Sequence, residues 1–539
     1  MRQQFERLGA LARWRRAAGI RAIDRTVLFV FCIAGLFFIV RFANWWFRAD
    51  NVANAPLFIL LSLAVWYGAA RIVTGWINIM AIREPPAAEA PPGLDVAIFT
   101  TSSPGEPLSM FDVTLQACAK IKYPHTTYLL DDTRDPRFRE LAEKHGAVWL
   151  ELVGFPGAKA GKINAALART TEEFILVLDP DHIPMPNMLD RILGHFRDVT
   201  VGFVQVCQAY YNQHRSLVAR GAAEQTFSFY GPTQMGLYGH GAAVAIGANC
   251  TFRRSALESI AGHGIGLAED LVTSIRLHAA GWRSVYVPEI VSRGLVPEDL
   301  GSFYKQQLKW ARGVYEVVFS ELPHAFARLS WRQRLSYGAI GTYYLFGVTT
   351  PMYLVIPYVY LWLGVQPAAM RFDEFISMGG PVAIMAVAMY LYAQRWLCDP
   401  GDERGLHLRG LMMKIACWPI FLAGTALAVM RAEIPYIPTA KEAVRGKFLR
   451  LAWPHLAVLT AYALTVARTL YSRLLLQPEG ALLLTSQAVW GMIAFATFAA
   501  VMSTGGIVAA WHARNPDVTQ PWTEYARYAR QEAEYATAE

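Results

Sequence analysis

The chain has 539 residues, of which 54% are hydrophobic and 17% charged, with a mean hydropathy of +0.25 and a formal net charge of +8. Soluble domains carry roughly a quarter of charged residues, so the composition excludes a wholly soluble protein and a disordered one. Six cysteines spread over this length exclude a small disulfide scaffold. A basic surplus in a membrane protein is typical of cytosolic loops, so we expect no nucleic-acid partner.

The N-terminal part predicts two membrane spans. An arginine-rich segment, 1–26, precedes apolar runs at 27–47 and 57–80, and each run is long enough to cross a bilayer. Arginines crowd the first segment, whereas Arg48 alone lies between the runs. The positive-inside rule therefore places the N-terminus and the segment that follows residue 82 in the cytosol.

Residues 94–323 have the pattern of an α/β domain. Short apolar runs at 95–100, 128–130, 147–152, 174–178 and 201–206 predict buried strands. Between them, 108–121, 136–145, 161–170 and 187–196 have helical apolar spacing. This alternation predicts a mainly parallel sheet with helices on both faces, and in such sheets ligands bind at the carboxyl ends of the strands.

The chain then returns to the membrane. Apolar runs at 337–365, 380–397, 451–471 and 485–511 predict four more spans, which makes six in all. A further apolar stretch, 408–430, carries Lys414 and Pro419 near its middle. It either crosses the membrane or lies flat in the interface. We favour the interfacial placement, because it leaves the basic segment 431–450 in the cytosol.

Acidic pairs follow two of the predicted strands. Asp179 and Asp181 stand two residues apart just after the strand at 174–178, and such carboxylates can share Mg²⁺ or Mn²⁺ with a diphosphate. Asp131 and Asp132 end another strand, where a carboxylate can accept from a base or a ribose hydroxyl. Each pair alone is equally typical of a turn.

Three further features stand at the starts or on the faces of helices. Lys159 opens a helix, where it suits a phosphate or is simply solvated. Glu269 and Asp270 precede another helical pattern. A carboxylate there either caps the helix or acts as a base that deprotonates an incoming hydroxyl. Gln306, Lys309 and Trp310 share one predicted helix. Together they would suit the binding of a diphosphate and a sugar. The alternative is an amphipathic helix at the membrane surface.

Taken in order, these motifs resemble those of the processive family 2 glycosyltransferases, the group of cellulose, curdlan, chitin and hyaluronan synthases. The resemblance extends from about residue 27 to 511 and is greatest to bacterial cellulose synthase catalytic subunits. Its remaining matches are Gly105-Glu106-Pro107, Val204-Gln205, Ile246-Gly247-Ala248-Asn249, Ala280-Gly281-Trp282 and Ile437-Pro438-Thr439-Ala440-Lys441, which looks like the gating loop of the family.

The chain departs from the family pattern at three positions. Thr133 stands where Gly is frequent, and Ala268 stands where Thr commonly precedes Glu-Asp. Lys309 replaces the usual Arg, so a single ammonium takes the place of a bidentate guanidinium fork. The segment after Trp511 also lacks the motif and length of a cyclic-di-GMP receptor domain.

The resemblance implies a GT-A (Rossmann-like) α/β domain, cytosolic and spanning 94–323, inserted in an α-helical transmembrane domain of about six spans. The transmembrane parts are 27–82 and 324–511, with interfacial helices at 408–430, a gating loop at 431–450 and a cytosolic tail at 512–539. It also implies an inverting glycosyltransferase that polymerises a UDP-sugar, most simply UDP-glucose, into a β-linked polysaccharide and moves it across the inner membrane of a bacterium. Its partners would be the donor, the growing polysaccharide, membrane lipid and an export partner in the periplasm.

The resemblance also implies roles for individual residues. Glu106, Asp131, Asp132 and Lys159 would hold the uridine end of the donor. Asp179 and Asp181 would bind the nucleotide sugar and a Mg²⁺ or Mn²⁺ ion, with Asp181 the more direct ligand. Asp270, beside Glu269, would act as general base. The acceptor end would be framed by Gln306, Lys309 and Trp310, and the diphosphate would be covered by Thr439 and Lys441.

Other functions fit part of this pattern. A non-processive enzyme that adds one sugar to a lipid carrier would share the carboxylates, and a synthase could use UDP-N-acetylglucosamine instead. A transporter with a nucleotide-regulated domain, or a scaffold with an inactive enzyme domain, would release no UDP from a UDP-sugar.

Overall fold

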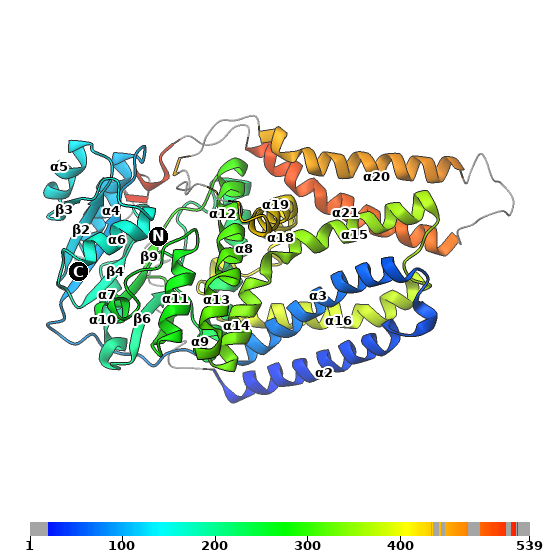
Figure 1. Ribbon diagram of the computed structural model, residues 1–539, viewed down its shortest axis with the longest axis horizontal. Coiled ribbons are helices and arrows are strands. Elements are labelled where there is room, and N and C mark those ends of the chain that lie inside the picture. Colours follow the sequence, from blue (N-terminus) through cyan, green and yellow to red (C-terminus); the bar gives the residue numbers. More distant parts are fainter. Residues whose placement is uncertain are drawn as a thin grey trace.

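The computed structural model describes residues 20–432, 434, 441–442, 448–472, 486–513, 519–523 and 525–526. An α/β domain forms one end of the molecule and a set of long helices forms the other (Figure 1). Shorter helices lie between the two parts and cross the direction of the long ones.

A seven-stranded sheet, with the order β3-β2-β1-β4-β7-β6-β8, forms the centre of the α/β domain. All five predicted strands are present, and every pairing is parallel except the two made by β7, which is antiparallel to β4 and β6. The strands are β1 (Val96–Thr101), β2 (Thr126–Asp131), β3 (Val148–Glu151), β4 (Phe174–Val177), β6 (Val201–Val206), β7 (Cys250–Arg253) and β8 (Arg283–Val287).

The sequence pattern did not predict β7 and β8. β7 has four residues, Cys-Thr-Phe-Arg, which is too short to show alternation, and it is held by pairing on both sides. A separate two-stranded ribbon, β5 (Ile183–Pro184) with β9 (Ser292–Arg293), follows the Asp179–Asp181 segment. A mainly parallel sheet was therefore the right expectation, with one antiparallel strand added at its centre.

The sheet is buried on both faces. Ile98, Leu176 and Val204 belong to one apolar cluster, whereas Phe99 and Phe203 belong to another. Neighbouring residues of one strand thus pack into different apolar clusters. Because both faces of the strands are buried, their sequences are continuous apolar runs and do not alternate with polar residues. The helices of this domain are α4 (Leu108–Cys118), α5 (Pro136–Lys144), α6 (Ala158–Leu167), α7 (Met188–Ile192), α10 (Arg254–Ser259) and α11 (Glu269–Ala279).

Three of these helices begin or end away from their predicted positions by more than one residue, and α4 ends at Cys118, three residues before its predicted end. α6 starts at Ala158, three residues before the predicted start, and its cap residue Gly157 has a φ of 93° that favours glycine. The predicted helix at 187–196 is α7 followed by the 3₁₀ helix η2 (Leu193–Arg197). Helix ends depend on local capping, which periodicity does not reveal.

The helices between the domain and the membrane part connect the two bodies. α8 packs against α18 and α12 packs against α19. This group consists of α8 (Leu217–Ser228), the π-helical turn η3 (Phe229–Thr233), α9 (Gln234–Gly239), α12 (Leu300–Phe319), α13 (Glu321–Ala325) and α14 (Trp331–Gly341).

Six helical segments of the described chain are long and apolar enough to span a membrane, as the sequence predicts, and the chain is a membrane protein. They are α2 (Ala22–Trp46), α3 (Ala55–Met80), α14 to α15 (Trp331–Leu363), α16 to η6 (Phe372–Trp396), η7 to α20 (Phe448–Tyr471) and the last part of α21 (Val489–His512). Their outer surfaces are apolar: Phe37, Leu63, Ile384 and Phe498 are all exposed.

The stretch 408–430 is not one straight helix. α18 (Leu408–Ala416) and α19 (Trp418–Val429) are bent by 43° at Cys417, a geometry of a broken span or a re-entrant segment. Its interfacial placement stays a prediction.

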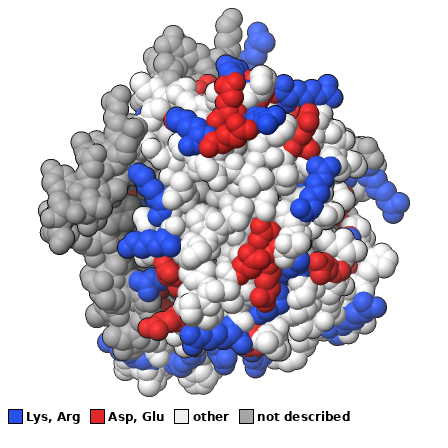
Figure 2. Space-filling view, turned by 90° about the vertical axis from the view of Figure 1, so that its left-hand side faces the viewer, with Lys and Arg blue, Asp and Glu red and all other residues white. Residues whose placement is uncertain are grey.

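The surface of the α/β domain differs from the apolar surface of the membrane helices. On the outer face of this domain, acidic and basic side chains intermingle (Figure 2).

Candidate active site

The Asp179–Asp181 segment lies where β4 ends, and lysines from distant parts of the chain reach both carboxylates. Lys159 Nζ donates to Asp179 Oδ1 and to the carbonyl oxygen of Gly247. Lys441 Nζ lies 3.1 Å from Asp181 Oδ2. The end of β4 thus supplies two acids, and the start of α6 and the segment that contains Lys441 each supply one cation.

These ion pairs dominate the electrostatics of the two carboxylates. Burial alone would raise the pKa of Asp181, but Lys441 and His182 hold it far below its usual range. Burial also acts to raise the pKa of Asp179, but the charges of Lys159, His182 and Lys441 together lower it. Both groups are therefore anionic at neutral pH, as an oxygen ligand for a divalent cation must be.

Asp179, Asp181 and His182 present ligand atoms within 4.8 Å of one another. His182 is occupied on both sides, since Nδ1 lies 3.1 Å from Asp181 Oδ1 and Nε2 lies 3.0 Å from Gln208 Oε1. The two carboxylates supply the hard oxygen donors that Mg²⁺ and Mn²⁺ accept, so the residues present fit such an ion. The imidazole is better suited to orient Asp181.

Glu269 and Asp270 form the first turn of α11. Ala268 holds the cap position, so neither carboxylate caps the helix as its Ncap residue. Asp270 Oδ1 accepts from the N–H of Leu271 at 2.8 Å. A Cβ built on Gly247, whose φ is 84°, would lie 3.5 Å from Asp270 Oδ2, so this loop passes beside the carboxylate.

Burial gives both carboxylates of this pair unusual proton affinity. It raises the pKa of Glu269 to about 7, with a further contribution from the charge of Asp270. Burial also raises the pKa of Asp270, and the nearby ammonium groups of Lys159 and Lys309 oppose the shift. A carboxylate that holds a proton near neutral pH is suited to general acid–base chemistry.

Gln205 keeps the Gly247 loop in place. Its amide nitrogen donates to Ala248 O at 2.9 Å and to Asn249 O at 3.1 Å, and its amide oxygen accepts from the N–H of Ile246 at 3.1 Å. Gln205 is completely buried in β6. The two short motifs at 204–205 and 246–249 are thus one structural unit beside Asp270.

α12 carries Gln306, Lys309 and Trp310 past the same carboxylates. Its approach is set at Gly313, where a built Cβ would lie 3.0 Å from the backbone nitrogen and Cβ of Ala268. Two small residues in contact let the helix backbone pass directly over the residue that precedes Glu269.

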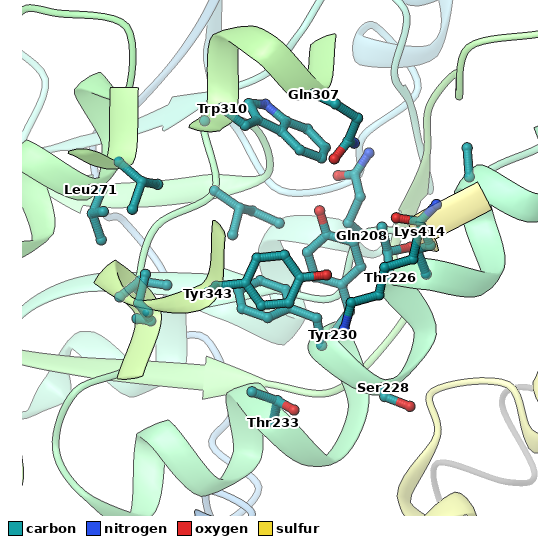
Figure 3. A pocket seen from close by; sticks show the side chains of 18 of the residues that line it. Gln208, Thr226, Ser228, Tyr230, Thr233, Leu271, Gln307, Trp310, Tyr343 and Lys414 are labelled. Atoms are coloured by element: carbon teal, nitrogen blue, oxygen red, sulfur yellow. The ribbon is translucent and has the colours of Figure 1, made fainter. Parts of the chain in front are cut away.

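These groups line one cavity of about 930 Å³, whose wall also includes residues of α3, α12, α14 and α18. Figure 3 shows Trp310, Tyr343 and Gln208 among its lining side chains. Beyond Trp310 its wall includes Tyr230, Tyr343 and Lys414, and the ammonium of Lys414 lies 4.8 Å from the ring centroid of Tyr343. The predicted site residues that line it are Lys159, Asp179, Asp181, Glu269, Asp270, Gln306, Lys309, Trp310 and Lys441.

Three predicted donor-binding residues do not line this cavity. Asp131 is buried and accepts hydrogen bonds from Ser102, Thr133 and Trp149, so the protein itself already uses both of its oxygens. Asp132 is more open, although Oδ1 accepts from the N–H of Gly154 at 3.1 Å.

Glu106 is the third residue outside the cavity wall. Its Oε2 accepts from the N–H of Ser103 at 2.8 Å, and burial raises its pKa to about 7 against the opposing charge of Lys441.

One residue beside these acids was not singled out from the sequence. Lys162 is buried on α6, donates to Ser102 O and Ser103 Oγ, and lies 3.8 Å from Asp132 Oδ2. Its signal was present, because it follows Lys159 by three residues and so shares its helix face. Thr439, predicted to cover the diphosphate, lies outside the described residues.

Comparison with known proteins identifies the domain. Residues 174–393 match the model of the glycosyl transferase family group 2. The chain is 29% identical over 365 residues to "Putative cellulose synthase 2" of Komagataeibacter xylinus, covering 65% of this chain and 23% of that protein. It is 30% identical over 324 residues to the UDP-forming cellulose synthase catalytic subunit of Xanthomonas axonopodis pv. citri (strain 306), covering 56% and 44%.

The chain thus spans less than half of the length of these relatives. Among solved structures, the mannosyltransferase PcManGT from Pyrobaculum calidifontis, in complex with GDP-Man and Mn²⁺, matches with a TM-score of 0.47 at 16% identity, over 70% of this chain and 100% of that one. The family match and the mixed sheet with its carboxylates at the strand ends agree on a GT-A-type domain. Over the matched ranges, the chain is therefore similar to the family 2 glycosyltransferases and to cellulose synthases.

Proposed function

We propose that the chain is an inverting, processive glycosyltransferase that polymerises a UDP-sugar, UDP-glucose, into a β-linked polysaccharide and passes it across the membrane. The observation that carries the proposal is the single cavity that joins the acids at the sheet edge to Trp310 and the membrane helices. An enzyme that only transfers a sugar needs only the part of this cavity at the acids of the sheet edge. An enzyme whose polymer leaves through the membrane also needs the part between the membrane helices.

The donor would lie along the edge of the sheet. Glu106 and Asp132 would border the uridine end. Lys159, which the resemblance assigns to the uridine end, would face the diphosphate together with Lys441, because it pairs with Asp179. Asp131 contributes by ordering Ser102 and Thr133, since its own oxygens are engaged with the protein. Buried ammonium groups stabilise the phosphate charge more strongly than exposed ones, because little water screens them.

Asp179 and Asp181 are the residues that would hold Mg²⁺ or Mn²⁺, with Asp181 the more direct ligand. When bound, the ion supplies positive charge against the departing diphosphate. Both carboxylates stay ionised because lysines accompany them.

Transfer would proceed in a single displacement. Asp270 takes the proton of the acceptor hydroxyl as its oxygen forms a bond to the anomeric carbon, and the bond from that carbon to the phosphate oxygen breaks to release UDP. Attack from the side opposite to the diphosphate inverts an α-linked donor to a β-linkage. Glu269 stands beside the base and shares its buried, proton-retaining environment.

The acceptor would enter from the membrane side. Trp310 offers an indole face to the terminal sugar, with Gln306 and Lys309 on the same helix, and the cavity continues toward Tyr343. Aromatic rings stack on the C–H faces of sugars without fixing one register. Such a surface lets a chain slide by one residue after each transfer.

The membrane arrangement follows from the distribution of charge. By the positive-inside rule, the arginines before α2 support a location of the N-terminal segment 1–26 and the α/β domain, 94–323, on the cytosolic side of a bacterial inner membrane. Residues 27–82 and 324–511 would form the transmembrane part, and 512–539 would be cytosolic. A periplasmic partner that receives the polymer would complete the export route.

The proposal is tested with purified protein in nanodiscs. Labelled UDP-glucose and Mn²⁺ should yield UDP and a polymer that a β-specific glucanase degrades. Release of UDP with one sugar on a lipid would identify a non-processive enzyme, and a polymer from UDP-N-acetylglucosamine alone would change the donor. Absence of UDP release from every UDP-sugar would refute a transferase.

A further inference from the structure

A segment that follows the last membrane helix returns to the α/β domain and packs against it. Its described residues, 519–523, 525 and 526, are called the strap here. Trp522 is fully buried, and Tyr525 and Ala526 are nearly so. They share an apolar cluster with Met110, Phe111 and other residues of α4 and α5. A large aromatic ring buried in this way anchors a short segment firmly.

Polar contacts give the strap a defined register on α4. The indole N–H of Trp522 donates to Ser109 Oγ at 3.2 Å, and the Ser109 hydroxyl donates to Gln520 Oε1 at 3.0 Å. The amide nitrogen of Gln520 then donates to Glu442 Oε1 at 3.1 Å. A continuous chain of hydrogen bonds thus connects the strap, α4 and the residue next to Lys441.

The strap also touches the loop that follows β6. The ring of Tyr525 stacks on that of Tyr211 with the centroids 4.9 Å apart. Arg215 donates to the carbonyl oxygen and hydroxyl of Thr519 at 2.8 and 2.9 Å, and its Nε lies 3.0 Å from Glu298 Oε1. Five side chains from three segments thus meet at this contact.

Three of the segments connected to the strap also contact the Asp179–Asp181 segment. Thr114 of α4 donates to the carbonyl oxygen of Pro180 at 2.6 Å, between the two carboxylates. The N–H of Leu295, three residues before Glu298, lies 3.3 Å from Asp181 Oδ2. Lys441, adjacent to Glu442, lies 3.1 Å from that same oxygen.

We propose that the strap is a positioning element for the donor site, which sets Asp181 and Lys441 in register through α4, the 295–298 segment and the contact between Gln520 and Glu442. Trp522 and Gln520 are its positioning residues, and neither touches the substrate. The inference rests on the proposed function for the identity of the donor. The geometry of the strap is independent of it.

The test uses the full chain in nanodiscs with Trp522→Ala, Trp522→Phe and Gln520→Leu. Trp522→Ala should raise both the Kd for UDP with Mn²⁺ and the KM for UDP-glucose about tenfold, while kcat changes less than about threefold. Trp522→Phe should recover most of the affinity, because a ring still fills the site. Gln520→Leu, which keeps the buried indole, should raise the Kd about threefold.

A purely structural role predicts a different outcome. Partial unfolding would lower the active fraction, and with it the apparent kcat, while the KM and Kd of the remaining molecules stayed unchanged. Trp453→Ala is the matched control, since that tryptophan is 67% exposed on α20 and outside the site. Hydrogen exchange over residues 108–118 should rise in Trp522→Ala and stay unchanged in Trp453→Ala.

The outcomes separate this inference from the proposed function. Wild-type binding of UDP with Mn²⁺, combined with unchanged Kd and KM in Gln520→Leu and in folded Trp522→Ala, overturns the positioning role alone. If Trp522→Ala does not fold, the Kd and KM of Gln520→Leu decide between a positioning role and a purely structural role. A wild-type protein that binds no UDP refutes the proposed function. It also overturns the positioning role, because the strap then has no donor site to position.

Discussion

Lys441 and Asp181 form a buried ion pair, with the lysine Nζ 3.1 Å from the carboxylate Oδ2. The pair joins a segment that follows the bent helices α18 and α19 to the end of strand β4. Lys159 forms a second ion pair, with Asp179. The two acids that fit a divalent ion are therefore already accompanied by two ammonium groups.

Lys441→Met tests this arrangement. Loss of an ammonium beside the diphosphate should raise the Kd for UDP with Mn²⁺ about tenfold. The Kd for Mn²⁺ alone should stay the same or fall, because the lysine and the ion compete for one carboxylate oxygen. Titration followed by electron paramagnetic resonance measures both. Lys120→Met, at an exposed position, is the control, and weaker binding of Mn²⁺ alone would contradict the competition.

Asp270→Asn should abolish turnover and spare donor binding. The amide cannot take the acceptor proton, so kcat should fall about a hundred- to ten-thousand-fold. The diphosphate contacts come from other residues, so the Kd for UDP should stay within about threefold. Asp50→Asn, at a side chain that is 83% exposed between the first two spans, should behave as wild type. A collapse of UDP affinity in Asp270→Asn would show that this residue binds the donor.

Glu269→Gln should stabilise the protein at alkaline pH. The pKa of Glu269 rises from 4.5 to about 7 on folding, so below pH 4.5 the carboxyl is protonated in both states and the variant should match wild type. As the pH rises from 4.5 through 7, the folded chain holds a proton that the unfolded chain has lost, and stability falls. Above that window the variant should gain up to about 3 kcal/mol.

Thermal unfolding of Glu269→Gln in detergent at pH 5 and pH 8 measures this difference. The expected result is a higher Tm at pH 8 and a much smaller change at pH 5. Glu258→Gln, at an exposed position on α10, should show no such dependence. An equal shift of the Tm at both values would mean that Glu269 is not the titrating group.

Gly313→Ala should lower activity although alanine favours helices. Its Cβ would stand 3.0 Å from Ala268, so α12 must move away from the Glu269–Asp270 turn. We expect kcat/KM to fall about tenfold. Gly338→Ala is the matched control, since a Cβ at that helical position meets nothing within 4 Å and should be neutral or stabilising by up to about 1 kcal/mol. Equal activities of the two variants would contradict the close approach.

Lys309 tests the departure from the family pattern. Lys309→Arg should keep activity within about threefold, whereas Lys309→Met should lower it about ten- to a hundredfold, because the positive charge beside the carboxylates is lost. Lys305→Met, exposed one turn earlier on α12, is the control. An inactive Lys309→Arg would show that the site has adapted to the smaller ammonium.

Much of the fold follows from local patterns. The strands β1, β4 and β6 were predictable because their residues are apolar on both faces, and the six spans were predictable from the length of their apolar runs. β7 was not, since four residues carry no period and its antiparallel pairing comes from its neighbours. The capping alternative for Glu269 was resolved only by the helix start, which places Ala268 at the cap.

Some features of the candidate site were predictable from the sequence, and others are visible only in the structure. Residue type and strand position suggested Asp179, Asp181 and Asp270 as chemical groups, and the cavity brings all three together. Sequence gave no sign that hydrogen bonds inside the protein engage both oxygens of Asp131. Nor did it indicate that Trp522 lies in the core of the α/β domain.

By itself, therefore, the order of residues determined what each segment is: an apolar span, a buried strand, or an acid at a strand end. Those properties depend on interactions within a few residues and on the length needed to cross a bilayer. Tertiary structure alone decided which distant groups meet, as Lys441 meets Asp181 and Trp522 meets Ser109. Such contacts arise from packing of whole elements, and no local period encodes the partner of a side chain.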